Sequence, residues 1–189
     1  MHADNWANKA KQEGYRTRAV YKLEEILQKT KSLKRTQNVL DLGSAPGGWA
    51  HYIKKKSPNS VVYAIDILDM EAVDGVYFFQ NSIEEIDNID SISSKMGSFG
   101  LVISDIAPNI TGINAIDIEN IYELNILTLD TAAKYLNKSH GSFIMKTFQN
   151  SMLKNLRKKM ELSFKIVQTF KPAASKKQSG EIFLYGAYK

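Results

Sequence analysis

The sequence predicts an α/β fold built as one doubly wound sheet with helices on both faces. Short β-rich runs alternate along the chain with amphipathic helical stretches, and short connections join them. The first β-rich run leads through a glycine-rich turn into a helix, as ligand-binding α/β folds commonly do. At 189 residues the chain is long enough for one domain with a substantial core and short for two. We therefore expect residues 1–189 to form a single domain.

Residues 1–35 form a basic segment in which residues 6–30 are predicted to be helical. Apolar side chains fall on one helical face, namely Ala19, Val20, Leu23, Ile26 and Leu27. Lys22 borders that face. A lysine at such a border usually extends its amine to water, so this residue taken alone favours a structural role.

Seven β-rich runs follow the N-terminal segment, and two long helices are expected among them. The runs cover residues 39–42, 60–66, 76–80, 99–103, 141–148, 164–170 and 181–188. The helices are predicted over residues 115–137 and 152–164.

The turn after the first β-rich run is Asp41-Leu42-Gly43-Ser44-Ala45-Pro46-Gly47-Gly48-Trp49. Its glycines allow positive φ angles and let the backbone approach a ligand closely. Their G-x-x-x-G-G spacing differs from the G-x-G-x-x-G of dinucleotide sites, and the Lys-Ser/Thr ending of a P-loop is missing. A ligand without a pyrophosphate fits better, and S-adenosylmethionine (SAM) is the candidate. An ordinary β–α turn is the alternative.

Polar side chains stand where several β-rich runs end. Asp66 could receive the ribose hydroxyls of a nucleotide-like ligand, or it could cap a loop. Ser82 could lie near an adenine, or it could be a helix N-cap, because S-x-x-E opens helices. Asp105 follows the fourth run, at the sheet edge where open α/β folds bind ligands. Lys146 lies near the end of an apolar run, so it must be either desolvated or functional.

Charge is distributed unevenly, although the net charge is only +5. Residues 1–35 carry nine Lys/Arg against four acids, and residues 152–177 carry eight against one, whereas residues 36–151 carry seven against fourteen. Two basic segments around an acidic centre suit a polyanion such as a nucleic acid, with solvated lysine faces as the alternative. The candidate phosphate contacts are Arg16, Arg18 and residues 54–56 and 154–159.

Composition excludes several other classes. Without Cys the chain has neither disulfides nor thiolate metal sites, and its three His residues lack ligand-like spacing. No apolar run approaches the ~20 residues of a membrane span, and no secretory apolar region is seen. We therefore expect an intracellular, metal-free protein without membrane partners, cytoplasmic or mitochondrial with the nucleus also open. Nothing in the chain demands more than a monomer.

Five motifs follow one another along the chain. They are Arg16-Thr17-Arg18-Ala19-Val20-Tyr21-Lys22-Leu23, the turn Asp41 to Trp49, Ser104-Asp105-Ile106-Ala107-Pro108-Asn109, Gly141-Ser142-Phe143-Ile144-Met145-Lys146, and Lys171-Pro172 with Ser179-Gly180-Glu181. In this order they resemble the FtsJ/RrmJ family of SAM-dependent RNA 2′-O-methyltransferases, from about residue 9 to the C-terminus. The resemblance implies a Rossmann-like methyltransferase fold, with a seven-stranded, mostly parallel sheet whose last strand is antiparallel.

The resemblance also implies which residues form the site. Its Lys-Asp-Lys-Glu catalytic tetrad falls on Lys22, Asp105, Lys146 and Glu181. Its SAM contacts fall on Gly43, Pro46, Gly47, Gly48, Trp49, Asp66, Asp105 and the position of Ser82. Many family members carry an acid where Ser82 stands, so the adenine contact there could be weaker or come from the backbone.

The implied reaction transfers a methyl group from SAM to a ribose 2′-hydroxyl of RNA and leaves S-adenosylhomocysteine. The Gly-Gly-Trp turn and the Asp-x-Ala-Pro-Asn motif resemble the large-subunit ribosomal RNA branch, which implies a uridine of the peptidyl-transferase A loop. We expect Lys146 to be the base or proton-steering group, held by Asp105 and Glu181, with Lys22 as a second cation. The alternatives are a tRNA methyltransferase of this family, a small-molecule SAM methyltransferase and a non-catalytic ribosome assembly factor.

Overall fold

A computed structural model describes residues 2–34, 36–176 and 178–188, without the side chains of residues 2–4. Its sheet contains β1 (Asn38–Leu42), β2 (Val61–Asp66), β3 (Val76–Gln80), β4 (Leu101–Ser104), β5 (Ser142–Phe148), β6 (Ile166–Phe170) and β7 (Glu181–Ala187). The strand order is β3-β2-β1-β4-β5-β7-β6, and β7 runs antiparallel to both of its neighbours whereas the other pairs are parallel. This confirms the predicted fold class and the antiparallel last strand.

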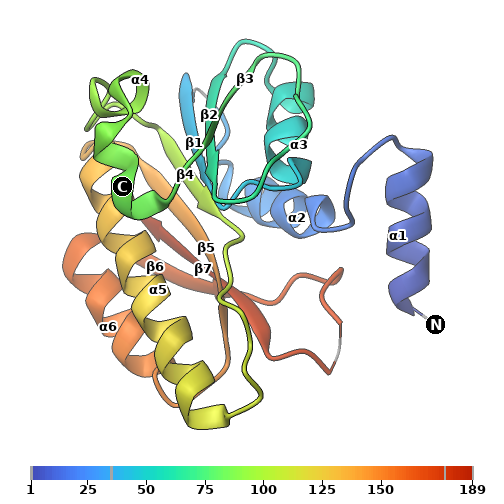
Figure 1. Cartoon of the computed structure of the whole chain (residues 1–189), viewed down its shortest axis with the longest axis vertical. Coiled ribbons are helices and arrows are strands. Elements are labelled where there is room, and N and C mark those ends of the chain that lie inside the picture. The colour runs from blue at the N-terminus through green and yellow to red at the C-terminus, as the bar shows by residue number, and fades with distance from the viewer. Residues whose placement is uncertain (1, 35, 177, 189) are drawn as a thin grey trace.

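Helices cover both faces of the sheet (Figure 1). One core lies under α2 (Val20–Thr30) and α3 (Gly48–Lys56), and the other lies under α5 (Asn114–Tyr135) and α6 (Leu153–Ser163). Val39 belongs to the first core and Leu40 to the second, because successive side chains of a strand point to opposite faces. The short helices η1 (Ile83–Asn88) and α4 (Asp90–Ser93) precede β4. In the described part of the chain, no helix combines the length and apolar character that crossing a membrane requires.

The prediction of one helix over residues 6–30 is wrong. α1 (His2–Gln12) ends before Gly14, whose φ of 75° is left-handed and favours glycine, and α2 begins only at Val20. Rings of the two helices still meet, because the ring centroids of Trp6 and Tyr21 lie 5.0 Å apart. The connection between the helices, residues 13–19, runs against the glycine-rich turn. It therefore contributes to the site rather than continuing a helix.

The connection between the parallel strands β2 and β3 contains no helix. Parallel neighbours are usually joined by a crossover helix. Here residues 67–75 return the chain without one, and all of these residues are described. The face beside α3 is consequently covered by a single extended segment.

Candidate functional site

Strand direction brings four charged residues from distant parts of the chain to one edge of the sheet. Asp105 follows β4, and Lys146 lies near the end of the parallel neighbour β5. Because β7 is antiparallel to β5, its first residue, Glu181, pairs with Phe148 at that same carboxyl edge. Lys22 reaches the edge from α2, on the face above. The structure thus brings together all four residues of the predicted tetrad.

The four side chains form two ion pairs. The Nζ of Lys22 lies 2.7 Å from Oε1 of Glu181 and donates to its Oε2 at 2.9 Å. The Nζ of Lys146 lies 3.1 Å from Oδ1 of Asp105, and it also donates a short hydrogen bond to the Asp105 carbonyl oxygen. We expected Glu181 to hold Lys146. In the structure Glu181 holds Lys22 instead, and Ser175 donates to it.

The surroundings of Asp105 raise the pKa of its carboxyl group. Burial raises the pKa of this carboxyl, and the nearby Lys146 and Lys22 only partly offset that effect. The Glu181 carboxylate adds a further upward influence on this pKa. These opposing influences act on the carboxyl group that pairs with Lys146.

The glycine-rich turn packs too closely for side chains at two of its positions. Gly43 has a φ of 75°, and a Cβ there would lie 2.8 Å from the Cβ of Ile106. A Cβ on Gly48 would lie 2.7 Å from Oγ1 of Thr17, which belongs to the connection between α1 and α2. The turn therefore requires glycine for packing against the protein as well as for access to a ligand.

A cavity of about 910 Å³ opens beside this turn, which is a suitable size for a nucleoside-sized ligand. Of the residues predicted to bind the cofactor, four line it: Gly43, Asp66, Ser82 and Asp105. Pro46, Gly48 and Trp49 line a small adjoining recess of about 20 Å³. The cavity therefore lies immediately beside the Asp105–Lys146 pair.

For Asp66 and Ser82 we considered either a ligand contact or a capping role, and the geometry of each residue is compatible with both. Asp66 accepts hydrogen bonds from the backbone N–H groups of Ala45 and Leu68, so it fixes two loops while it lines the cavity. Ser82 is the N-cap of η1, where its hydroxyl accepts from the Glu84 N–H, and it also lines the cavity. Each is a loop anchor whose side chain is exposed to a ligand.

Two of the predicted cofactor residues also have structural roles. The indole N–H of Trp49 donates to the Ala19 carbonyl at 3.0 Å, which ties α3 to the start of α2. At Gly47 a Cβ would lie 2.7 Å from Nη1 of Arg16 and 2.9 Å from Sδ of Met70. Both residues therefore help to fix the shape of the turn.

The sequence analysis overlooked Asp41 and Ser44 as site residues. Asp41 is only 1% exposed, and its two carboxylate oxygens and the Ser44 hydroxyl have no hydrogen-bond partner in the described part of the protein. Burial, together with Asp105 and Asp66, raises the pKa of Asp41 well above its ordinary value. All three orphaned oxygens adjoin the small recess, so they fit a ligand that brings a hydrogen-bond-donating cation. The sequence signal that could have identified Asp41 is an acidic residue inside an apolar run.

Arg16 differs from our expectation of a simple phosphate contact. Its guanidinium donates to the carbonyl oxygens of Pro46, Glu71 and Ala72 at 2.8, 2.7 and 2.7 Å. It thereby clamps the glycine-rich turn to the connection between β2 and β3. Three exposed lysines of α6, Lys154, Lys158 and Lys159, keep the surface position that a phosphate contact requires.

Known proteins share this fold and sequence pattern. The pattern of FtsJ-like methyltransferases matches residues 15–189. Ribosomal RNA large subunit methyltransferase E of Neisseria meningitidis serogroup B is 40% identical, with 98% of this chain and 91% of the relative covered. The protein of that name in Dechloromonas aromatica is 37% identical, covering 97% of this chain and 90% of the relative.

A solved structure points the same way. A Plasmodium falciparum protein, provisionally named a ribosomal RNA methyltransferase, superposes with a TM-score of 0.77 at 28% identity, covering 92% of this chain and 97% of that one. The family pattern covers all four charged residues of the sheet edge and the turn beside them. The chain therefore belongs to the FtsJ-like methyltransferase family.

Proposed function

We propose that this protein transfers a methyl group from SAM to a ribose 2′-hydroxyl of large-subunit ribosomal RNA. The observation that carries the proposal is the Lys146–Asp105 pair, which lies at the rim of a nucleoside-sized cavity. The names of the curated relatives support ribosomal RNA as the substrate. We further propose that the protein acts inside the cell as a monomer.

The cavity residues would hold the cofactor by its polar ends. Asp66 and Ser82 line the wider part, where a ribose and an adenine would be received. Asp41 and Ser44 line the narrow recess, where their unpartnered oxygens would accept hydrogen bonds from an ammonium group. SAM would supply an electrophilic methyl carbon carried on a sulfonium sulfur.

Lys146 would handle the hydroxyl proton. A ribose hydroxyl is a poor nucleophile at neutral pH, so a base near its oxygen should contribute about 10²–10⁴-fold to the rate. Oδ1 of Asp105 lies 3.1 Å from the Nζ of Lys146, so the carboxylate can orient this amine toward the hydroxyl. When Lys146 takes the hydroxyl proton, the neighbouring Asp105 carboxylate would stabilise the new ammonium group.

Lys22 and Glu181 would hold the acceptor nucleotide in place. Their ion pair fixes the Lys22 ammonium beside the reacting groups, where it can meet the ribose hydroxyl or an adjacent phosphate. Well-held geometry is worth up to about 7–11 kcal/mol of an activation barrier. This assignment gives the second pair an orienting role and the first pair the proton transfer.

Methyl transfer from labelled SAM tests the proposal directly. Large ribosomal subunits, total RNA and tRNA serve as separate substrates, and nuclease-resistant dinucleotides locate the label. We expect 2′-O-methyl label in large-subunit RNA, and none above background with the Lys146→Ala variant. Label confined to tRNA would contradict the substrate, and no label in any RNA despite intact SAM binding would contradict the activity.

A further inference from the structure

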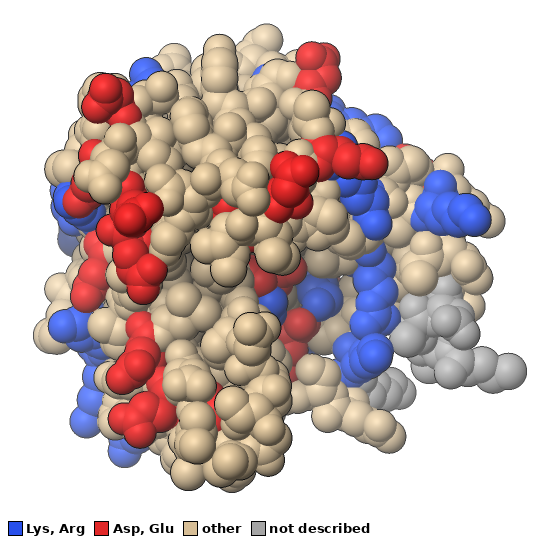
Figure 2. Space-filling model, in the orientation of Figure 1, with Lys and Arg blue, Asp and Glu red and all other residues tan. Residues whose placement is uncertain are grey.

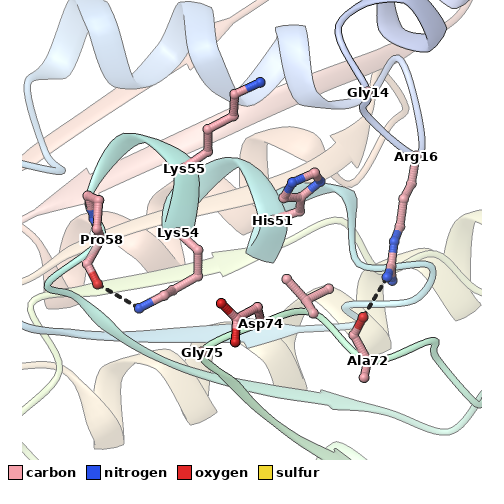
Figure 3. Close-up of a pocket in the computed structure, with 10 residues that line it drawn as sticks. Gly14, Arg16, His51, Lys54, Lys55, Pro58, Ala72, Asp74 and Gly75 are labelled. Atoms are coloured by element: carbon pink, nitrogen blue, oxygen red, sulfur yellow. Dashed lines mark hydrogen bonds between the residues drawn. The ribbon is translucent and has the colours of Figure 1, made fainter.

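A second hollow, of about 550 Å³, lies beside α3 (Figure 3). It exists because residues 67–75 return the chain without a crossover helix, which leaves the space between that connection and α3 open. Among the described residues that line it, none also lines the cofactor cavity. We call it the α3 pocket. Its walls come from α3, from the connection between β2 and β3, and from Gly14 and Arg16.

Two cations of the α3 pocket are fixed in place by neutral partners. Arg16 donates to three backbone carbonyls, and Lys54 donates to the carbonyls of Pro58 and Ser60 at 2.7 and 2.8 Å. The Lys54 side chain crosses Gly75, where a Cβ would lie 2.6 Å from its Cε. Carbonyl oxygens position a cation without cancelling its charge, so both charges remain available to an anion.

Lys55 and His51 also line the pocket. The Nζ of Lys55 lies 4.6 Å from the ring centroid of Tyr15, and it donates to the Glu13 carbonyl at 3.3 Å. The His51 ring packs edge-on against the same tyrosine, with 5.7 Å between centroids. Burial lowers the pKa of His51, and Arg16 and Lys55 lower it further. Two cations of the pocket therefore disfavour the protonated form of His51.

Acidic side chains offset little of this positive charge. Asp74 is the one acid among the described lining residues, and it is exposed. Glu71 reaches within 3.9 Å of Arg16, but its side chain is 92% exposed, so water screens that pair. The pocket thus presents three fixed cations against one lining carboxylate.

The path of the chain connects this pocket to the proposed reaction centre. Arg16 contacts both the pocket and the cofactor turn, and the connection that carries it continues into α2 and Lys22. Figure 2 shows Lys and Arg gathered in a strip between the central hollow and the N-terminal helix, with acidic side chains at the upper end of this strip and along the opposite side of the molecule. A polyanion bound at the reaction centre is therefore expected to extend along the α2 and α3 side of the molecule.

We infer that the α3 pocket binds phosphate groups of the RNA substrate, a step that rests on the proposed function. Its cations are positioned before the RNA arrives, so little ordering of long side chains opposes binding. Phosphate contacts hold an RNA strand without reading its sequence. The pocket would therefore add affinity and orientation, while the sheet edge carries out the chemistry.

The first test removes one cation of the pocket. Lys55→Gln keeps the side-chain stem, and Lys95→Gln is its matched control, because Lys95 also lies over a tyrosine ring, 5.7 Å from Tyr63, outside the pocket. Affinity for a fluorescent large-subunit ribosomal RNA transcript is measured by anisotropy across salt concentrations. One lost phosphate contact lowers the salt slope by roughly 0.7–0.9, which is about 5- to 8-fold in affinity at 0.1 M salt. We expect this change for Lys55→Gln alone.

The second test removes the carboxylate of Asp74, so the expected effect is an increase in RNA affinity. Asp74→Asn should tighten RNA binding by about 2- to 5-fold, since it deletes the lining carboxylate without changing shape. Asp130→Asn, at an exposed position on α5, controls for net charge. If Lys55→Gln matches its control, or if Asp74→Asn fails to tighten binding, the inference is overturned. The proposed function would survive either result, provided that wild-type protein methylates ribosomal RNA.

Discussion

The two Lys–carboxylate pairs of the site differ in how the chain assembles them. Asp105 and Lys146 come from the neighbouring parallel strands β4 and β5, so the sheet itself brings them together. Lys22 and Glu181 come from α2 and from the antiparallel strand β7, which are far apart in sequence. The first pair depends on local strand order, whereas the second depends on the whole fold.

The surroundings of the two pairs differ as well. Glu181 is saturated, because both of its oxygens meet Lys22 and Ser175 also donates to Oε1. Asp105 is half-buried beside the cofactor cavity, and its pKa is raised. A saturated pair keeps its geometry, whereas a pair that borders the cavity can meet the reacting groups. The difference supports proton transfer at Lys146 and positioning at Lys22.

Removal of the proton-transferring amine should produce the largest effect. Lys146→Ala is expected to lower kcat by about 10³-fold or more, because the hydroxyl loses its base. SAM affinity should stay within about 2-fold of wild type, since Lys146 does not line the cofactor cavity. Steady-state methyl transfer and calorimetric SAM titration measure the two quantities. Lost SAM binding would contradict the assignment.

Removal of the second pair's carboxylate should have a smaller effect on rate. Glu181→Gln leaves the Lys22 ammonium, whose side chain is 10% exposed, without its charge partner. We expect a loss of roughly 10- to 100-fold in kcat/KM and about 2–3 kcal/mol of unfolding free energy. Adding Lys22→Met should restore much of the stability but not the activity. A double variant as unstable as Glu181→Gln would argue against a buried ion pair.

Asp41 extends the comparison to a buried carboxylate that forms no ion pair within the described part of the chain. Its folded pKa lies well above the unfolded value, so the penalty is absent below about pH 4 and grows as the pH rises toward the folded pKa. Asp41→Asn should therefore stabilise the SAM-free protein by about 1–2 kcal/mol near neutral pH. Thermal unfolding at pH 4 and pH 7.5 measures this. A gain of equal size at both values would contradict the electrostatic cause.

Ser82→Ala should give the smallest effect. The hydroxyl caps η1 and lines the cavity, but the Ser82 N–H is already bonded to the Asn81 side chain. Loss of the cap should cost about 0.5–1 kcal/mol of stability, and SAM affinity should fall by less than about 3-fold. Calorimetry checks both values. A loss of SAM affinity above tenfold would make the hydroxyl a principal adenine contact.

The strand pattern placed Asp105 at the carboxyl edge of the sheet, and the family resemblance supplied the rest of the tetrad. The strand pattern alone left Lys146 as either desolvated or functional. The partner of Glu181 was mispredicted, because it depends on how α2 lies above β7. The break at Gly14 was missed because helical periodicity hides a single left-handed residue. The α3 pocket was beyond reach, since it results from a crossover that lacks a helix.

Single-turnover methyl transfer by Lys146→Ala and Lys22→Ala, with saturating SAM and large-subunit RNA, compares the two pairs most directly. Saturation removes differences in binding, so the measured rate reports the chemical step. The account predicts that Lys146→Ala is slower than Lys22→Ala by at least about tenfold. Equal losses in the two variants, or a slower Lys22→Ala, would contradict the division into a proton-transferring pair and a positioning pair.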